Sequence, residues 1–99
     1  MFLAVIRHDK PDSLSLRQAT RPRHLEYLEK VTDCIAYGGA LLDDRGQQIG
    51  SILIIDVLDR ETAEQFAAND PFVEAGLFAA THILQFRQVF QDGFRLPGR

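Results

Sequence analysis

Apolar residues recur along the chain in runs and alternations that predict four strands. Residues 2–7 are almost continuously apolar, which is typical of a strand buried on both faces. Residues 37–43 and 50–57 predict two further strands, and the turn-forming residues 44–48 between them predict a hairpin. Residues 77–90 predict a last strand, because apolar side chains occupy both alternating sets of positions.

Between these strands, two segments have apolar residues at helical spacing. The first helix is predicted to begin near Pro22, after a separate short turn over residues 14–17. Its buried stripe would consist of apolar residues three or four positions apart within residues 25–35. The second helix is predicted over residues 60–68, with Asp59 as its N-terminal cap.

The order of these elements, βαββαβ, predicts an α+β fold of the ferredoxin-like type, with a four-stranded antiparallel sheet and two helices on one face. Residues 1–99 are expected to form a single domain with an exposed tail at 91–99. The helices can cover one face of the sheet, whereas several strands are apolar on both faces. We therefore expect a homodimer through the other sheet face; the alternative is a mildly apolar face that tolerates water.

Composition narrows the classes of partner. The chain is 45% hydrophobic and 25% charged, and no apolar run approaches the roughly 18 residues that a membrane-spanning helix needs. Its net charge of −3 gives no long-range attraction to phosphate backbones, so neither nucleic acid nor a membrane is expected as a partner. The N-terminal residues predict a strand instead of a signal peptide, which indicates a cytoplasmic protein. The single cysteine, Cys34, lies among apolar residues and is interpreted as a packing residue.

Candidate chemistry centres on Asp70, which precedes Pro71 at the end of the second helix. A carboxylate here can cap a short helix, because it accepts a backbone N–H while proline needs no donor at the first helical position. It can also orient one of the three histidines, His8, His24 or His82, by fixing the tautomer of the ring. The residues alone leave open whether such a pair is catalytic, is a structural tie, or is absent because Asp70 only caps.

Two other arrangements have weaker support. Ser51 with His24 and Asp70 has the residue types of a hydrolase triad, but the sequence lacks the strained turn that exposes a nucleophilic serine. A metal site would draw on residues that match none of the usual ligand spacings, namely His8, Asp9, Asp12 and His24. Arginines near the first helix can hold a small anion such as a carboxylate, and these are Arg7, Arg17, Arg21 and Arg23.

Four stretches form a specific combination: Arg-Pro-Arg-His-Leu at residues 21–25, residues 39–44, residues 50–54, and residues 68–78 with their Asp-Pro-Phe turn. Together they resemble the YCII-related family, a branch of the dimeric α/β-barrel superfamily, over residues 1 to about 90. The resemblance implies a pocket between helices and sheet, in which His24 meets Asp70 and Ser51 faces or neighbours the pocket. Two positions depart from the family pattern, which often has proline at Ala40 and tyrosine at Phe72.

The resemblance also implies an activity. A relative in chlorinated-aromatic degradation is similar to a dehydrochlorinase with such a His/Asp pair, and muconolactone isomerases share the wider fold. We therefore expect a lyase or isomerase in which His24 is the general acid/base and Asp70 its orienter, with no cofactor and no metal. The ligand is expected to be a small anionic or aromatic molecule. The alternative is a non-catalytic dimeric module that binds a metabolite or a protein. The expected substrate-binding residues are Ser51, Phe72, Arg21 and Gly39.

Overall fold

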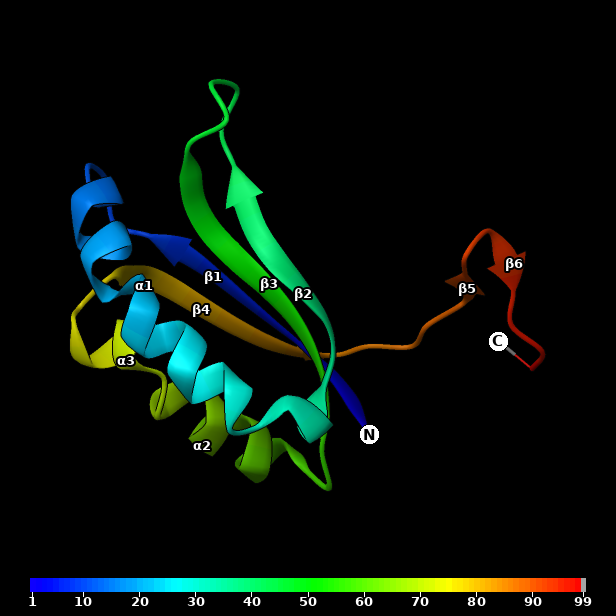
Figure 1. Cartoon of the computed structure of the whole chain (residues 1–99). Helices are drawn as coiled ribbons and strands as arrows, with labels where there is room; N and C mark the ends of the chain where they lie inside the picture. Colours follow the sequence, from blue (N-terminus) through cyan, green and yellow to red (C-terminus); the bar gives the residue numbers. More distant parts are fainter. Residues whose placement is uncertain (99) are drawn as a thin grey trace.

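The computed structural model describes residues 1–98, in which helices pack on one face of a four-stranded antiparallel sheet (Figure 1). The strands lie in the order β2-β3-β1-β4, so the first strand is central and the second and fourth are edges. This is the predicted ferredoxin-like α+β arrangement. The elements, in chain order, are β1 (Phe2–Asp9), α1 (Leu14–Glu29), the 3₁₀ turn η1 (Thr32–Cys34), β2 (Ile35–Leu42), β3 (Gln48–Asp56), α2 (Arg60–Ala68), α3 (Pro71–Glu74) and β4 (Phe78–Gln85).

The apolar core lies between α2 and the two central strands. Leu3 and Val5 of β1 pair with Ile55 and Leu53 of β3, and all four side chains are buried on the helix-facing side of the sheet. Helix α2 covers them with its own apolar face. The α2 bounds agree with the prediction, and Asp59 caps the helix by accepting the backbone N–H of Thr62 at 2.8 Å.

Helix α1 differs from its prediction in both its start and its buried face. It begins at Leu14 and continues through Pro22. Proline has no N–H, so one carbonyl in the preceding turn has no partner within the helix; because Pro22 is exposed, water can hydrogen-bond to this carbonyl. The early start has a tertiary cause, because the buried Arg17 side chain forms an ion pair with Asp9 of β1 and ties the first turn to the sheet. The most buried side chains of α1 are polar, while the predicted apolar stripe is only half-buried. The buried residues of α1 are Arg17, Thr20 and His24.

The predicted last strand is too long. Strand β4 ends at Gln85, because its partner β1 begins at Phe2, whose carbonyl accepts the N–H of Phe86 at 3.0 Å; beyond that point no residue of β1 remains to pair. Residues 86–98 leave the sheet and contain a small hairpin, β5 (Phe90–Gln91) with β6 (Phe94–Arg95). The other strand bounds shift by two residues or fewer from the prediction.

The face of the sheet opposite the helices carries apolar side chains. Alternation along the paired strands puts Ile6, Ile52 and Leu84 on this face, and Leu84 is 57% exposed. His8 and His82 lie on the same face with their ring centroids 6.3 Å apart. Among residues 1–98, no helix has the combination of length and hydrophobicity that crossing a membrane requires.

Candidate functional site

The aspartate that the sequence singled out is the N-cap of α3. Oδ1 of Asp70 accepts the backbone N–H of Phe72 at 2.9 Å, and Pro71 occupies the first turn, as the capping pattern predicts. Gly76 ends the short helix with a φ of +77°, a value that L side chains rarely adopt. These local features hold the Asp70 carboxylate in one orientation with 1% of its surface exposed.

His24 is in contact with this carboxylate. Its Nδ1 lies 2.9 Å from both Oδ1 and Oδ2 of Asp70, across 46 residues of sequence. Because an ionised carboxylate only accepts hydrogen bonds, Nδ1–H must be the donor, and the neutral ring then has its lone pair on Nε2. Nε2 has no hydrogen-bond partner among the residues that the structure describes. The ring is therefore fixed at one nitrogen and free at the other.

Asp70 has a second partner, the guanidinium of Arg7, which the sequence analysis did not pair with it. Nη2 of Arg7 donates to Oδ2 of Asp70 at 2.8 Å, and both side chains are fully buried. Burial by itself would raise the pKa of the Asp70 carboxyl, but the hydrogen bond from His24, the charge of Arg7 and the N–H of Phe72 outweigh it, so this pKa lies below its usual value. The carboxylate is thus kept ionised beneath His24.

Three aromatic contacts hold the polar cluster in place. Phe72 stacks on His24 with ring centroids 4.1 Å apart and an angle of 21° between the planes. The guanidinium of Arg17 lies 4.9 Å from the centroid of the same Phe72 ring, and the guanidinium of Arg7 lies 4.5 Å from the centroid of the Phe78 ring. Since Phe72 is fully buried, it supports the imidazole from behind instead of presenting a free surface.

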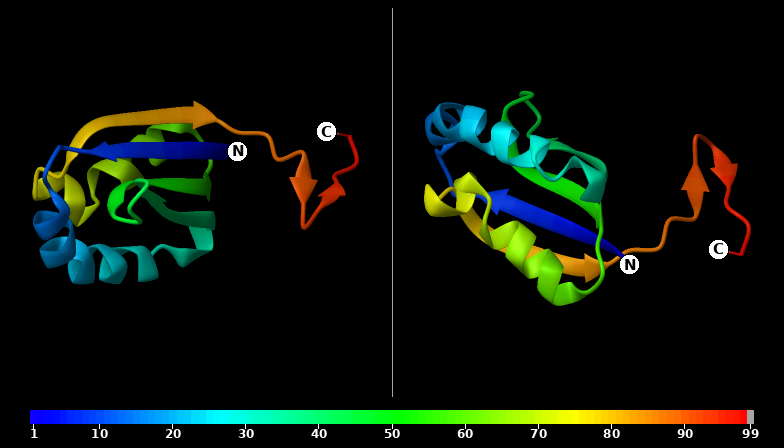
Figure 2. Two further views of the ribbon diagram at one scale, coloured as in Figure 1. Left: turned by 90° about the horizontal axis from the view of Figure 1, so that it is seen from above. Right: turned by 60° about the horizontal axis from the view of Figure 1, so that its bottom comes forward.

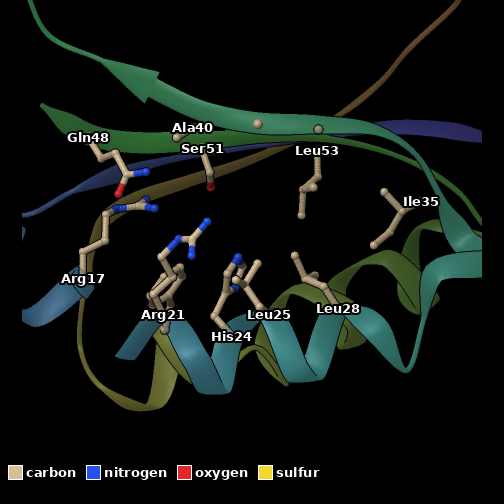
Figure 3. A pocket seen from close by; sticks show the side chains of 13 residues that line it. Arg17, Arg21, His24, Leu25, Leu28, Ile35, Ala40, Gln48, Ser51 and Leu53 are labelled. Atoms are coloured by element: carbon tan, nitrogen blue, oxygen red, sulfur yellow. The ribbon is translucent and has the colours of Figure 1, made fainter. Parts of the chain in front are cut away.

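A pocket of about 270 Å³ opens between α1 and the strands β2 and β3 (Figure 3). His24 and Arg21 reach into it from the helix, and Ser51 points toward them from β3 (Figure 3). Apolar side chains form the end near the start of β2. The residues that line the pocket are Arg17, Arg21, His24, Leu25, Leu28, Ile35, Gly38, Gly39, Ala40, Gln48, Ser51, Leu53 and Phe72.

All four residues expected to bind substrate line this pocket, in different ways. The Oγ of Ser51 is buried and has no hydrogen-bond partner among the described residues, which is costly for a polar atom unless a ligand or water satisfies it. Arg21 is exposed and forms none of the ion pairs found within residues 1–98. Gly39 contributes backbone only, since a Cβ there would meet open space. Phe72 is the wall behind His24.

Of the arginines considered for anion binding, two are already engaged. Arg7 is paired with Asp70, and Arg17 donates to both carboxylate oxygens of Asp9, from Nε at 2.7 Å and from Nη2 at 3.0 Å. Arg21 is therefore the pocket arginine that remains for a ligand. The metal alternative also loses its ligands, because Asp9 is held by Arg17, and no group of three or more metal-ligating side chains gathers within residues 1–98.

The apolar half of the pocket was not predicted as such. Leu25 and Leu28 were assigned to a buried stripe, and their helical spacing correctly puts them on one face, but that face borders the pocket. Gly38 sits where a Cβ would collide with Leu53, so a larger residue would press on the pocket floor. For Arg7 a signal did exist, because a charged residue that ends an apolar strand needs a buried partner.

Comparisons with known proteins agree with this architecture. Residues 1–87 match the model of the YCII-related domain. An uncharacterized protein of Haemophilus influenzae is 30% identical over 98 residues, which cover 91% of this chain and 100% of the relative. The protein YciI of Escherichia coli is 31% identical over 102 residues, with 91% of this chain and 100% of the relative covered.

Two solved structures are also similar. The 5-chloro-2-hydroxyhydroquinone dehydrochlorinase of Burkholderia phenoliruptrix, in complex with 2,5-dihydroxybenzoquinone, superposes with a TM-score of 0.82 at 36% identity, over 88% of this chain and 94% of that chain. An antibiotic biosynthesis monooxygenase superposes with a TM-score of 0.53 at 14% identity, over 90% of this chain and 99% of that one. The second likeness concerns the fold alone.

Proposed function

This chain belongs to the YCII-related family, and we propose that it is a lyase or isomerase that moves a proton on a small molecule at His24. The observation that carries the proposal is the contact of His24 Nδ1 with the buried Asp70 carboxylate at the wall of a pocket. A fixed Nδ1–H leaves Nε2 as the proton acceptor, which is the geometry a general base requires.

The reaction would proceed by proton transfer at one atom. Nε2 of His24 accepts a proton from a carbon or hydroxyl of the bound molecule, and Asp70 stabilises the imidazolium that forms. In a lyase, the electron pair left behind expels a leaving group such as chloride. In an isomerase, the imidazolium returns the proton to a different carbon. Neither path requires a cofactor.

The pocket suits a small, planar, anionic ligand. Within residues 1–98, Arg21 forms no ion pair and the Ser51 hydroxyl has no hydrogen-bond partner, so two oxygens of a ligand can be bound on the side of the pocket near α1 and β3. The backbone of Gly39 and the apolar residues beyond it can accept a flat ring. The similar dehydrochlorinase supports this choice of ligand, because its structure is a complex with 2,5-dihydroxybenzoquinone.

Turnover of a small panel tests this proposal. The panel contains two compounds. Conversion of 5-chloro-2-hydroxyhydroquinone is measured as release of chloride, and conversion of muconolactone is measured as formation of its isomer. Binding of 2,5-dihydroxybenzoquinone is measured in parallel. We expect the wild-type protein to bind the quinone and convert a panel member. Arg21→Gln and Ser51→Ala are expected to weaken quinone binding by about tenfold each, since each removes one directed contact worth roughly 1.4 kcal/mol.

The alternative function is a non-catalytic module that binds a metabolite or a protein. It is favoured by one feature, the satisfaction of Asp70 by groups that also tie the fold together, namely Arg7 and the Phe72 N–H. If the protein is such a module, the wild type converts no substrate, and His24→Gln lowers the free energy of unfolding. An unchanged fold with lost turnover identifies the enzyme instead.

We also propose that the chain forms a homodimer through the sheet face opposite the helices. The apolar side chains of Ile6, Ile52 and Leu84 on this face support the proposal, because a twofold contact would remove them from water. Sedimentation equilibrium at micromolar concentration is expected to give twice the mass of the chain, and Leu84→Glu is expected to shift it toward the monomer. A strictly monomeric wild type would contradict the proposal.

A further inference from the structure

Residues 86–98, here called the arm, leave the end of β4 and stand away from the sheet and helices in all three views (Figures 1 and 2). The arm is folded in itself. Phe90 pairs with Arg95 and Gln91 with Phe94, and the turn residues Asp92 and Gly93 have φ values of +52° and +80°. An Asp-Gly pair with two positive φ values is the preferred two-residue turn of a β-hairpin. The sequence therefore encodes this hairpin locally.

A hairpin of this size needs a surface to pack against. Strands of two residues give a ribbon that is at best marginally stable in water. The arm nevertheless carries large apolar side chains that its own fold does not cover, since Phe90 is 60% exposed and Phe94 is 76% exposed. Paired residues share a face, so the two rings lie on opposite faces of the ribbon. A surface that contacts one face of the ribbon would bury only one of the two rings, whereas a groove between two protein surfaces would bury both.

We propose that the arm packs on a second copy of this chain, at the edge of the sheet-face dimer proposed above. The arm follows directly from β4, whose Leu84 belongs to the apolar sheet face. In a twofold dimer, each copy supplies one arm and one receiving surface, so the two arms are buried by two equivalent contacts. The family model ends at residue 87, so most of the arm lies beyond the range that this model matches.

Charge favours a second copy of the chain as the occupant. Residues 86–98 contain Arg87 and Arg95 against the single acid Asp92, so the arm is positive. Residues 1–85 contain thirteen acidic and eight basic residues, so the receiving body is negative. Because each whole chain is net negative, this attraction acts locally between the arm and the receiving surface, where it adds to the burial of the two phenylalanine rings.

The experiment is a measurement of the dimer dissociation constant by sedimentation equilibrium, for the wild type and for Phe90→Ser/Phe94→Ser. The matched control is Leu58→Ser, which removes an 87% exposed leucine outside the arm. We expect the double variant to raise the dissociation constant by at least about tenfold and the control to leave it unchanged. Measured at a concentration at which the chain is monomeric, both variants should keep the wild-type urea transition, because none of the three replaced side chains belongs to the core.

The outcomes separate the two proposals. A wild-type monomer overturns the dimer and the arm together. A wild-type dimer whose dissociation constant is the same in Phe90→Ser/Phe94→Ser overturns the arm alone and leaves the sheet-face dimer standing. Equal weakening in Leu58→Ser would also overturn it, since the effect would then follow from any exposed apolar residue.

Discussion

Replacement of Asp70 by asparagine tests the electrostatic structure of the site, because it keeps the shape of the side chain but removes its charge and turns one of its two acceptor oxygens into an N–H donor. Asparagine caps helices about as well as aspartate, so the Phe72 N–H keeps its acceptor. Arg7, which is 0% exposed, loses its only ion-pair partner within the described residues and becomes an uncompensated buried cation. Breaking a buried pair in this way costs about 3–5 kcal/mol.

Urea unfolding measures this cost. With a slope of about 1.5 kcal/mol per molar, the midpoint of Asp70→Asn should fall by on the order of 2 M. Adding Arg7→Met should recover part of the loss, because the unpaired charge is then gone, and the two changes should be strongly non-additive. Asp59→Asn replaces a cap that has no buried cation and should leave the midpoint nearly unchanged. A loss below about 1 kcal/mol in Asp70→Asn, or no recovery in the double variant, would refute the reasoning.

Two further predictions concern the same region. The pKa of Asp70 is lower in the folded than in the unfolded chain, so the contribution of this carboxylate to stability is present above about pH 4 and is lost as the pH falls through the folded value. The free energy of unfolding, measured between pH 6 and pH 3, should therefore fall more steeply for the wild type than for Asp70→Asn. Parallel curves would contradict this. Tyr27 donates to the Phe66 carbonyl at 2.8 Å and so ties α1 to α2; Tyr27→Phe should cost about 1 kcal/mol in urea unfolding, and an unchanged midpoint would show that water replaces the bond.

Local chemistry made part of the fold predictable. Asp59 and Asp70 cap helices through hydrogen bonds to residues two or three positions away, and the 60–68 helix has the predicted bounds. The four-stranded antiparallel sheet with helices on one face followed from the βαββαβ succession of elements. By contrast, the end of β4 depends on where β1 begins, and the start of α1 depends on the Arg17–Asp9 ion pair. Such boundaries are set by partners distant in sequence, which periodicity does not contain.

The site was predictable to a similar extent. The meeting of His24 and Asp70 was expected from the family resemblance, and the structure has them 2.9 Å apart. That Arg7 shares the same carboxylate was not expected, because sequence alone does not reveal which buried charges neutralise each other. The same pairing is the reason that Arg21, and not Arg7, is proposed to bind a ligand.

Turnover by His24→Gln, measured beside His82→Gln, tests the central proposal most directly. His82 lies on the opposite face of the sheet, so its replacement controls for the loss of an imidazole outside the pocket, provided that sedimentation gives this variant the wild-type mass. For the panel compound that the wild type converts fastest, kcat of His24→Gln should fall by at least about 100-fold, while His82→Gln retains wild-type turnover. A kcat of His24→Gln within about threefold of the wild type, or a wild type that converts no panel compound, would contradict proton transfer by His24.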